Sequence, residues 1–454
     1  MDDDDQLRPT RGGATPFAAV RGVLGIAAGL ALIALVFAIG GGRLPGGRWL
    51  AIHLFTLGPL TLLVVAFSGQ LGAGFVQARP QSPRVALLAV GAGILWLAVP
   101  AAQSGRLVAT ERAAVGVGAT VVTAGVMASW VRLRRLRKGA PAARWAWIVR
   151  IYERAHGAYA HGALLGALLG AGVFSGRWYL AAQRAHLHVM IVGFAGITLV
   201  ATLVVFGPAL LRGRMAPDVA TRAQAALRWA VVGVTVASAG LVLSALNGVA
   251  GTIARVVAAG GLAAFARAAT IVGLAVVWTA RNRSAGARGR VIGSHVAAVA
   301  VLLVVAAWAD VVIVALGAWT WLDALGGLAL VGVLANATAA VVTFAGAQVL
   351  GADVTQRRLR GERLDALHPW TALATTIGVA AIVAAQAPIA TGADWHDVVG
   401  RLGVGLLSVA AALLAGLTAS SRPVRAADSL VAEQAVGEVG QDAVGAVGEA
   451  HDGL

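Results

Sequence analysis

The stretch RAHLHVMIVGFAGITLVATLVVFGPALLR, residues Arg184–Arg212, decides the fold. It is an apolar run longer than the ~20 residues that a helix needs to cross a bilayer. It opens with two histidines, His186 and His188, and ionisable residues are rare inside hydrocarbon. The stretch therefore predicts a membrane-spanning helix that carries polar groups near one end.

Composition extends this prediction to the whole chain of 454 residues, of which 59% are hydrophobic and 12% charged. A soluble domain carries about 25% charged residues. Comparable apolar runs recur along the chain, which predicts an all-α polytopic membrane helix bundle with the lipid bilayer as its main partner. The 59 glycines suit close helix–helix approach in lipid. The chain has no cysteine, which excludes disulfides, thiolate metal sites and iron–sulfur clusters.

About twelve runs are long enough to cross a hydrocarbon core of ~30 Å at ~1.5 Å per residue. The predicted spans are 18–40, 49–76, 84–102, 111–131, 147–174, 184–211, 227–247, 254–280, 291–317, 321–350, 366–387 and 398–418. They form one predicted transmembrane domain, residues 17–421, between a disordered tail (1–16) and a low-complexity acidic tail (422–454). No cleavable signal peptide is evident at the start of the chain.

The net charge of +16 comes almost entirely from arginine, since Lys138 is the one lysine. The arginines cluster in alternate predicted loops, at 132–150, 212–228, 281–290 and 357–363. The positive-inside rule makes these loops cytoplasmic, which places a multi-pass protein in the plasma membrane with both termini inside. This distribution explains the basic residues better than nucleic-acid binding does.

The second, sixth and tenth predicted spans resemble one another. His53 is followed five residues later by Gly58, and His188 by Gly193. The tenth span begins with Trp321-Leu322, as the second begins with Trp49-Leu50, and has Asp323 where a histidine would come. This pattern predicts a repeat of four helices that occurs three times, in three arcs of four.

His53, His186 and His188 are the first candidates for binding a cofactor, because neutral imidazole ligates copper, zinc and haem iron. Residues i and i+2 of a helix point about 200° apart. His186 and His188 therefore serve two different sites, or one ligates while the other caps or faces the interface. The alternative is that all three are hydrogen-bonded histidines at helix ends. Met190 offers either a soft sulfur ligand or packing.

Charged residues within spans are costly and are functional candidates. Arg267 lies in the eighth span, Asp310 in the ninth and Asp323 at the start of the tenth. Arg267 either needs a carboxylate, from the protein or from a haem propionate, or reaches the interface with its long side chain. The structural alternative is an Arg267–Asp310 pair that only holds helices together.

A second polar group is predicted near the cytoplasmic end of the fifth span. Glu153 and His156 can meet at spacing i, i+3, whereas His161 points about 140° away from His156. The group is either a proton path or a structural pair. The remaining histidines considered lie at span ends or in an outer loop: His295, His368 and His396.

The segment AHLHVMIVGFAGITLVATLVVFGPALLRGRM, residues 185–215, resembles membrane proteins related to haem–copper oxidase subunit I and to the NnrS family of nitric-oxide-response proteins. It is most similar to the membrane region of actinobacterial proteins labelled copper oxidase. The resemblance implies twelve helices in three arcs of four, with the second, sixth and tenth spans lining the interior.

The chain departs from that family in its histidines. Such an oxidase takes ligands from spans 2, 6, 7 and 10, whereas here only spans 2 and 6 supply them, as His53, His186 and His188. We therefore expect haem or copper binding near the outer face, in metal or nitrogen-oxide response, with Arg267 beside the cofactor, rather than a complete terminal oxidase.

The sequence leaves two alternatives open. One is a secondary transporter of a small solute, favoured by twelve spans and by Gly-Pro interruptions at Gly58-Pro59 and Gly207-Pro208. The other is a scaffold whose site has decayed. ATP-driven transport has no support within the chain, because the sequence contains no phosphate-binding loop.

Overall fold

The structure is a computed structural model of the chain. It describes residues 21–40, 44, 47–78, 82–103, 109–140, 143–211, 213–214, 216, 218–282, 291–338, 340–341, 368–386 and 403. Several predictions lie outside these residues: both tails, almost all of the span at 398–418, the arginine cluster at 357–363, and His396. The side chains of His295 and His368 also lie outside the described part.

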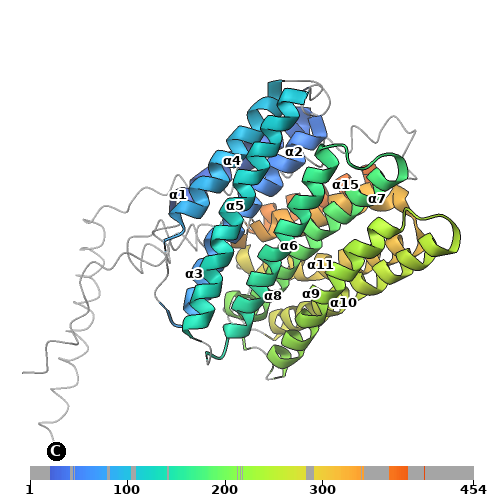
Figure 1. Ribbon diagram of the computed structural model, residues 1–454. Helices are drawn as coiled ribbons and strands as arrows, with labels where there is room; N and C mark the ends of the chain where they lie inside the picture. The colour runs from blue at the N-terminus through green and yellow to red at the C-terminus, as the bar shows by residue number, and fades with distance from the viewer. Residues whose placement is uncertain are drawn as a thin grey trace, which may run out of the picture.

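Every regular element in the described residues is helical, and the helices form one bundle (Figure 1). Seven of these helices are long and apolar enough to cross a membrane, and three shorter apolar helices accompany them. Large apolar side chains such as Leu88, Trp229 and Leu274 are exposed on the outside of the bundle. An apolar surface of this kind suits contact with a lipid bilayer. The structure therefore agrees with an all-α membrane protein.

The first five crossings follow one another with short connections. They are α1 (Arg21–Gly40), the rod formed by α2 (Gly47–Phe55), the π-helical segment η4 (Thr56–Leu60) and α3 (Thr61–Phe75), then α4 (Arg84–Gln103), α5 (Ala109–Gly139) and α6 (Ala146–Gly170).

The next crossings complete the described bundle. They are the rod of α7 (Gly176–His188), the π-helical segment η5 (Val189–Gly196) and α8 (Ile197–Leu210), then α9 (Val219–Leu243), α10 (Gly248–Arg281), α11 (Val291–Leu316), the rod of the 3-10 turn η7 (Trp319–Trp321), α12 (Leu322–Gly327) and the π-helical segment η8 (Leu328–Ala335), and finally α15 (His368–Gln386).

Eleven of the twelve predicted spans coincide with these helices, but several predicted ends are wrong. The sixth crossing begins at Gly176 rather than 184, α9 begins at Val219 rather than 227, and α5 continues to Gly139 rather than ending at 131. Arginine and glutamine are good helix formers, so the helix continues past the apolar run into the polar interface. Arg132, predicted to lie in a loop, is therefore a helical residue of α5.

Helix contacts in the described residues repeat every four crossings. The first crossing of each group packs on the second: α1 on α2, α6 on η5 and α11 on η8. The third packs extensively on the fourth in two groups, as α4 on α5 and α9 on α10. The fourth then packs on the first of the next group, as α5 on α6 and α10 on α11. The likeness of the second, sixth and tenth spans in the sequence predicts a repeat of the same length.

Each of those three rods contains a π-helical segment, η4, η5 or η8. Gly193 and Gly332 are both the fifth residue of their segments. Pro59 lies inside η4, where its missing N–H prevents regular α-helical hydrogen bonding. The Thr61 hydroxyl donates to the Thr56 carbonyl at 2.7 Å. π-helical segments are rare and often occur at functional sites, so they mark these rods.

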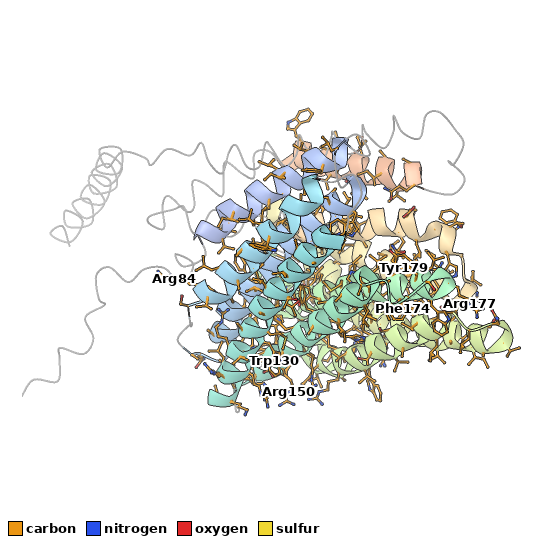
Figure 2. The ribbon with its side chains drawn as sticks, turned by 45° about the horizontal axis from the view of Figure 1, so that its top comes forward. Arg84, Trp130, Arg150, Phe174, Arg177 and Tyr179 are labelled. Atoms are coloured by element: carbon orange, nitrogen blue, oxygen red, sulfur yellow. The ribbon has the colours of Figure 1, made fainter. Side chains whose placement is uncertain are left out.

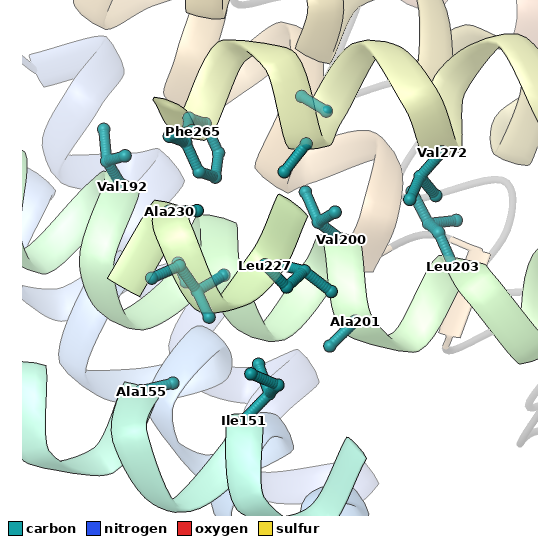
Figure 3. Packing of buried hydrophobic residues seen from close by; sticks show 14 of the residues in the cluster. Ile151, Ala155, Val192, Val200, Ala201, Leu203, Leu227, Ala230, Phe265 and Val272 are labelled. Carbon is teal, nitrogen blue, oxygen red and sulfur yellow. The ribbon is translucent and has the colours of Figure 1, made fainter. Parts of the chain in front are cut away.

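The sixth crossing lies in the middle of the core. Figure 3 shows Val192 and Val200 from this crossing among side chains of three neighbouring helices, with Ile151 from α6, Leu227 from α9 and Phe265 from α10. The sixth crossing also contacts α11. Polar groups on it can therefore reach α6 in one direction and α11 in another.

Helix α6 runs from one end of the bundle to the other. Trp130 and Arg150 lie near the end at which α6 begins, and Phe174, Arg177 and Tyr179 lie near the other (Figure 2). In the predicted topology the first of these ends faces the cytoplasm.

Candidate functional site

His186 of α7 is held against α6 by one hydrogen bond and one glycine. Its Nδ1–H donates to the carbonyl oxygen of Gly162 at 2.7 Å. A Cβ atom added to Gly166 would lie 2.9 Å from Cε1 of the same imidazole ring. Because glycine has no side chain, the His186 ring can lie against α6 at Gly166.

The same packing continues along the sixth crossing. A Cβ atom on Gly162 would lie 2.5 Å from Sδ of Met190, and one on Gly193 would lie 3.1 Å from Cβ of Ala158. Small residues at every fourth position of α6 thus face His186, Met190 and Gly193 in turn. Such small-residue stripes let membrane helices approach closely. The stripe places the imidazole and the thioether on the same face of α6.

A substitution at Gly166 tests this packing. We expect Gly166→Ala to displace the His186 ring and to cost about 1–3 kcal/mol, the usual cost of overpacking. Gly170→Ala is the matched control, because no atom lies within 4 Å of the added Cβ. Thermal unfolding of the two variants in detergent measures the difference. Equal unfolding temperatures would show that Gly166 is not needed to seat the ring.

His53 of α2 is anchored in a similar way. Its Nδ1–H donates to the carbonyl oxygen of Trp49 at 2.7 Å, and its ring stacks on the Trp49 indole with centroids 4.0 Å apart. His53 and His186 lie near enough to interact electrostatically. Leu50 and Leu54, which flank His53, share a hydrophobic cluster against which Met190 packs. The second and sixth crossings therefore meet at this level.

In both His53 and His186 the bond to a carbonyl fixes the neutral tautomer. A carbonyl oxygen can only accept, so Nδ1 carries the hydrogen and Nε2 keeps its lone pair. Metal-binding histidines commonly have this arrangement, in which a carbonyl orients the ring and the other nitrogen ligates. The geometry leaves both Nε2 atoms suited to ligation.

His188 is different, because both of its ring nitrogens are engaged. Nδ1 donates to the Arg184 carbonyl at 2.6 Å, and Nε2 lies 2.9 Å from Oδ1 of Asp310 on α11. The Nε2–Oδ1 contact holds a proton on one atom or the other, and both side chains are buried. The lone pair of Nε2 is thus committed to this pair. As the i, i+2 spacing requires, His186 and His188 face different helices.

Arg184, at the same end of the bundle, lies over the ring of Trp319, 4.0 Å from its centroid. This cation–π contact joins the sixth crossing to the turn η7 that follows α11. It places an arginine near the His188–Asp310 pair.

Arg267 does not join this group. It is exposed on α10, while Asp310 pairs with His188. The Arg267–Asp310 pair considered from the sequence is therefore wrong. The error arises because depth alone suggested a partner, whereas the direction in which each side chain leaves its helix decides it. Asp323, the third charged candidate, is exposed at the start of α12.

The inner polar group is also arranged differently from expectation. Glu153 accepts two hydrogen bonds from Arg137 of α5, at 2.5 and 3.2 Å, instead of meeting His156. His156 donates from Nδ1 to the Tyr152 carbonyl at 2.8 Å, and His161 lies 3.4 Å from the Ser238 hydroxyl. The three residues considered as a proton path or as a structural pair therefore form separate contacts within the described part of the chain.

Three features of these sites are missed by reasoning from the sequence. That reasoning gives Met190 no firm role, counts Arg132 with the loop arginines, and does not single out Gly166. The spacing of Gly162, Gly166 and Gly170 at every fourth residue is the available signal for the stripe on α6.

No family model matches the chain, and no curated protein is significantly similar to it. Within the described residues, no group of three or more histidine, aspartate and glutamate side chains is arranged to hold a metal ion. Two imidazoles and a thioether in one region of the bundle are therefore the groups from which a function can be inferred.

Proposed function

We propose that the protein binds copper or haem through His53 and His186, and acts in metal or nitrogen-oxide response. One observation carries the proposal: each imidazole has its Nδ1–H fixed by a backbone carbonyl, which leaves Nε2 free. His188, the third histidine expected from the sequence, is assigned to the Asp310 pair instead.

The available donors fit copper better than haem. Imidazole suits copper, and a thioether favours its reduced form Cu(I). Met190 packs on Gly162, whose carbonyl also accepts the hydrogen bond from His186. Arg267, the arginine expected beside a haem propionate, is exposed on α10. When bound, copper would supply one-electron redox chemistry or a site for a nitrogen oxide, while the chain holds the rings and keeps the region apolar.

We further propose a twelve-crossing, oxidase-like arrangement in three arcs of four that is not a complete terminal oxidase. The repeat of helix contacts and the three π-helical segments support the arcs. The seventh crossing, α9, and the tenth crossing contain no histidine, so the second and third metal centres of an oxidase have no ligands there.

The proposed orientation places both termini in the cytoplasm. Because the chain has no cysteine, single cysteines can report it. We expect Gly139→Cys, at the end of α5, to react with a membrane-impermeant maleimide only in lysed cells, and Ser175→Cys, before α7, to react in intact cells. The opposite labelling pattern would invert the topology.

The transporter alternative loses one of its supports. Pro59 lies inside η4 and Pro208 inside α8, and neither Gly-Pro interruption breaks its helix within the described rods. Transporters typically bind substrate at unwound backbone. The metal proposal is therefore preferred.

An optical spectrum and metal analysis of detergent-purified protein test the proposal. Protein from cells replete with copper and haem should carry one of the two at close to one equivalent. A colourless and metal-free preparation from such cells would refute it.

A further inference from the structure

Arg132 of α5 is buried, and no carboxylate among the described residues pairs with it. Its side chain is 8% exposed, and its Nη2 donates to the Val65 carbonyl of α3 at 3.2 Å. The described residues give it no carboxylate partner, and its Nε atom has no hydrogen-bond partner. A buried charge without a partner is strongly unfavourable, so this arginine calls for an explanation.

The backbone of α3 is shaped to admit this side chain. A Cβ atom on Gly69 would overlap Nη2 of Arg132 and lie 2.8 Å from its Cζ. The absence of a side chain at Gly69 lets the guanidinium lie directly against α3. The guanidinium is thus packed against α3 and buried inside the protein.

Two serines lie on the stripes that carry this contact. Ser68 lies one turn beyond Val65 and next to Gly69 on α3, and Ser129 lies one turn before Arg132 on α5. Both side chains are buried, and neither hydroxyl has a hydrogen-bond partner within the described part of the chain. The spacing therefore places each serine within one turn of a residue that takes part in the Arg132–Val65 contact.

His156 of α6 reaches the same level of the bundle. Gly72 of α3 contacts Val149 of α6. Val65 lies two helical turns before Gly72, and His156 lies two turns after Val149. Because α3 and α6 run in opposite directions, these two residues are at about the same height. The Nε2 atom of His156 is buried and also has no hydrogen-bond partner among the described residues. Four buried polar atoms that have no partner in the described part of the chain thus lie on the segments along which α3, α5 and α6 pack.

We propose that this junction binds a small monovalent inorganic anion such as chloride. Arg132 supplies the charge and a free Nε–H, and the hydroxyls of Ser68 and Ser129 supply further donors. Nε2 of His156 can accept a hydrogen bond from a water molecule bound with the anion. The anion would neutralise the guanidinium and engage donors that are otherwise unsatisfied.

An ion pair between α5 and α6 lies beside the junction. Glu153 is one turn before His156, towards the N-terminus of α6, and it pairs with Arg137 of α5. This ion pair holds α5 and α6 together next to the junction. The site is separate from the proposed metal site and does not depend on it.

Chloride-dependent thermal stability of the full-length purified protein tests the site. We expect the unfolding temperature to rise by about 2–4 °C when gluconate is replaced by chloride at constant ionic strength, because a ligand stabilises the state that binds it. Arg132→Gln should abolish the rise. Arg135→Gln, which removes an exposed charge from the same helix, should keep it.

A smaller substitution covers a failure of Arg132→Gln to fold. Ser129→Ala removes one donor and should shift the chloride titration to higher concentration. An unshifted titration for Ser129→Ala, an equal response of Arg132→Gln and the unaltered protein, or no difference between chloride and gluconate would each overturn the proposal. Copper or haem content is measured in parallel, and it should be unchanged in Arg132→Gln, so this test is independent of the metal site.

Discussion

Alanine at His53 or at His186 is expected to reduce bound copper or haem from about one equivalent to near zero. Each imidazole supplies one free Nε2, and within the described residues no group of three or more histidine, aspartate and glutamate side chains is arranged to hold a metal ion. With two nitrogen donors, the loss of either leaves too few strong ligands for tight binding. Metal analysis and the absorption spectrum of purified variants measure the loss.

His188 provides the matched control for this experiment. It is only two residues from His186, but its Nε2 is engaged by Asp310. His188→Gln should therefore retain most of the bound metal, even if the protein is less stable. Metal loss in His188→Gln with retention in His186→Ala would reverse the assignment and place the ligand on the other face of the sixth crossing.

Met190 distinguishes the two cofactors. If copper is bound as Cu(I) with help from the thioether, Met190→Leu should lower the copper affinity while preserving volume, because leucine and methionine are similar in size. A haem held only by the two imidazoles would be retained. The contact between Met190 and Gly162 makes this substitution informative, since its position is fixed by packing.

The helices could be predicted from the sequence because their signal is local. Apolar runs of bilayer length predicted eleven of the crossings that the described residues contain. The predicted helix ends are wrong where polar residues continue the helix, as at the end of α5 (Gly139) and the start of α9 (Val219). An apolar run indicates which part of a helix is suited to the hydrocarbon core, whereas backbone hydrogen bonding decides where the helix ends.

The partners within the sites could not be predicted in the same way. The i, i+2 spacing showed that His186 and His188 diverge, but not that Asp310, distant in the chain, faces one of them. A π-helical segment adds a residue to a turn and rotates the rest of the helix, so helical-wheel arguments lose register beyond it. Such rotations depend on packing between crossings, which single-sequence reasoning does not see.

The His188–Asp310 pair gives the second large expected effect, on stability. His188→Leu leaves a buried carboxylate without its partner, and Asp310→Leu leaves a buried imidazole nitrogen unpaired. We expect the first to cost about 3–5 kcal/mol, as for other broken buried pairs. The second should cost about 1–3 kcal/mol, because the imidazole can lose its proton and leave one unsatisfied nitrogen.

The double variant His188→Leu/Asp310→Leu should regain most of this loss. Replacing both members of a buried pair by apolar residues removes the unsatisfied groups together, and such replacements are often neutral or stabilising. Unfolding of the three variants in detergent gives the coupling energy, expected to be at least about 2 kcal/mol. A double variant as unstable as the sum of the single variants would mean that the two side chains are independent. In that case His188 would return as a candidate ligand, since its Nε2 would no longer be committed to Asp310.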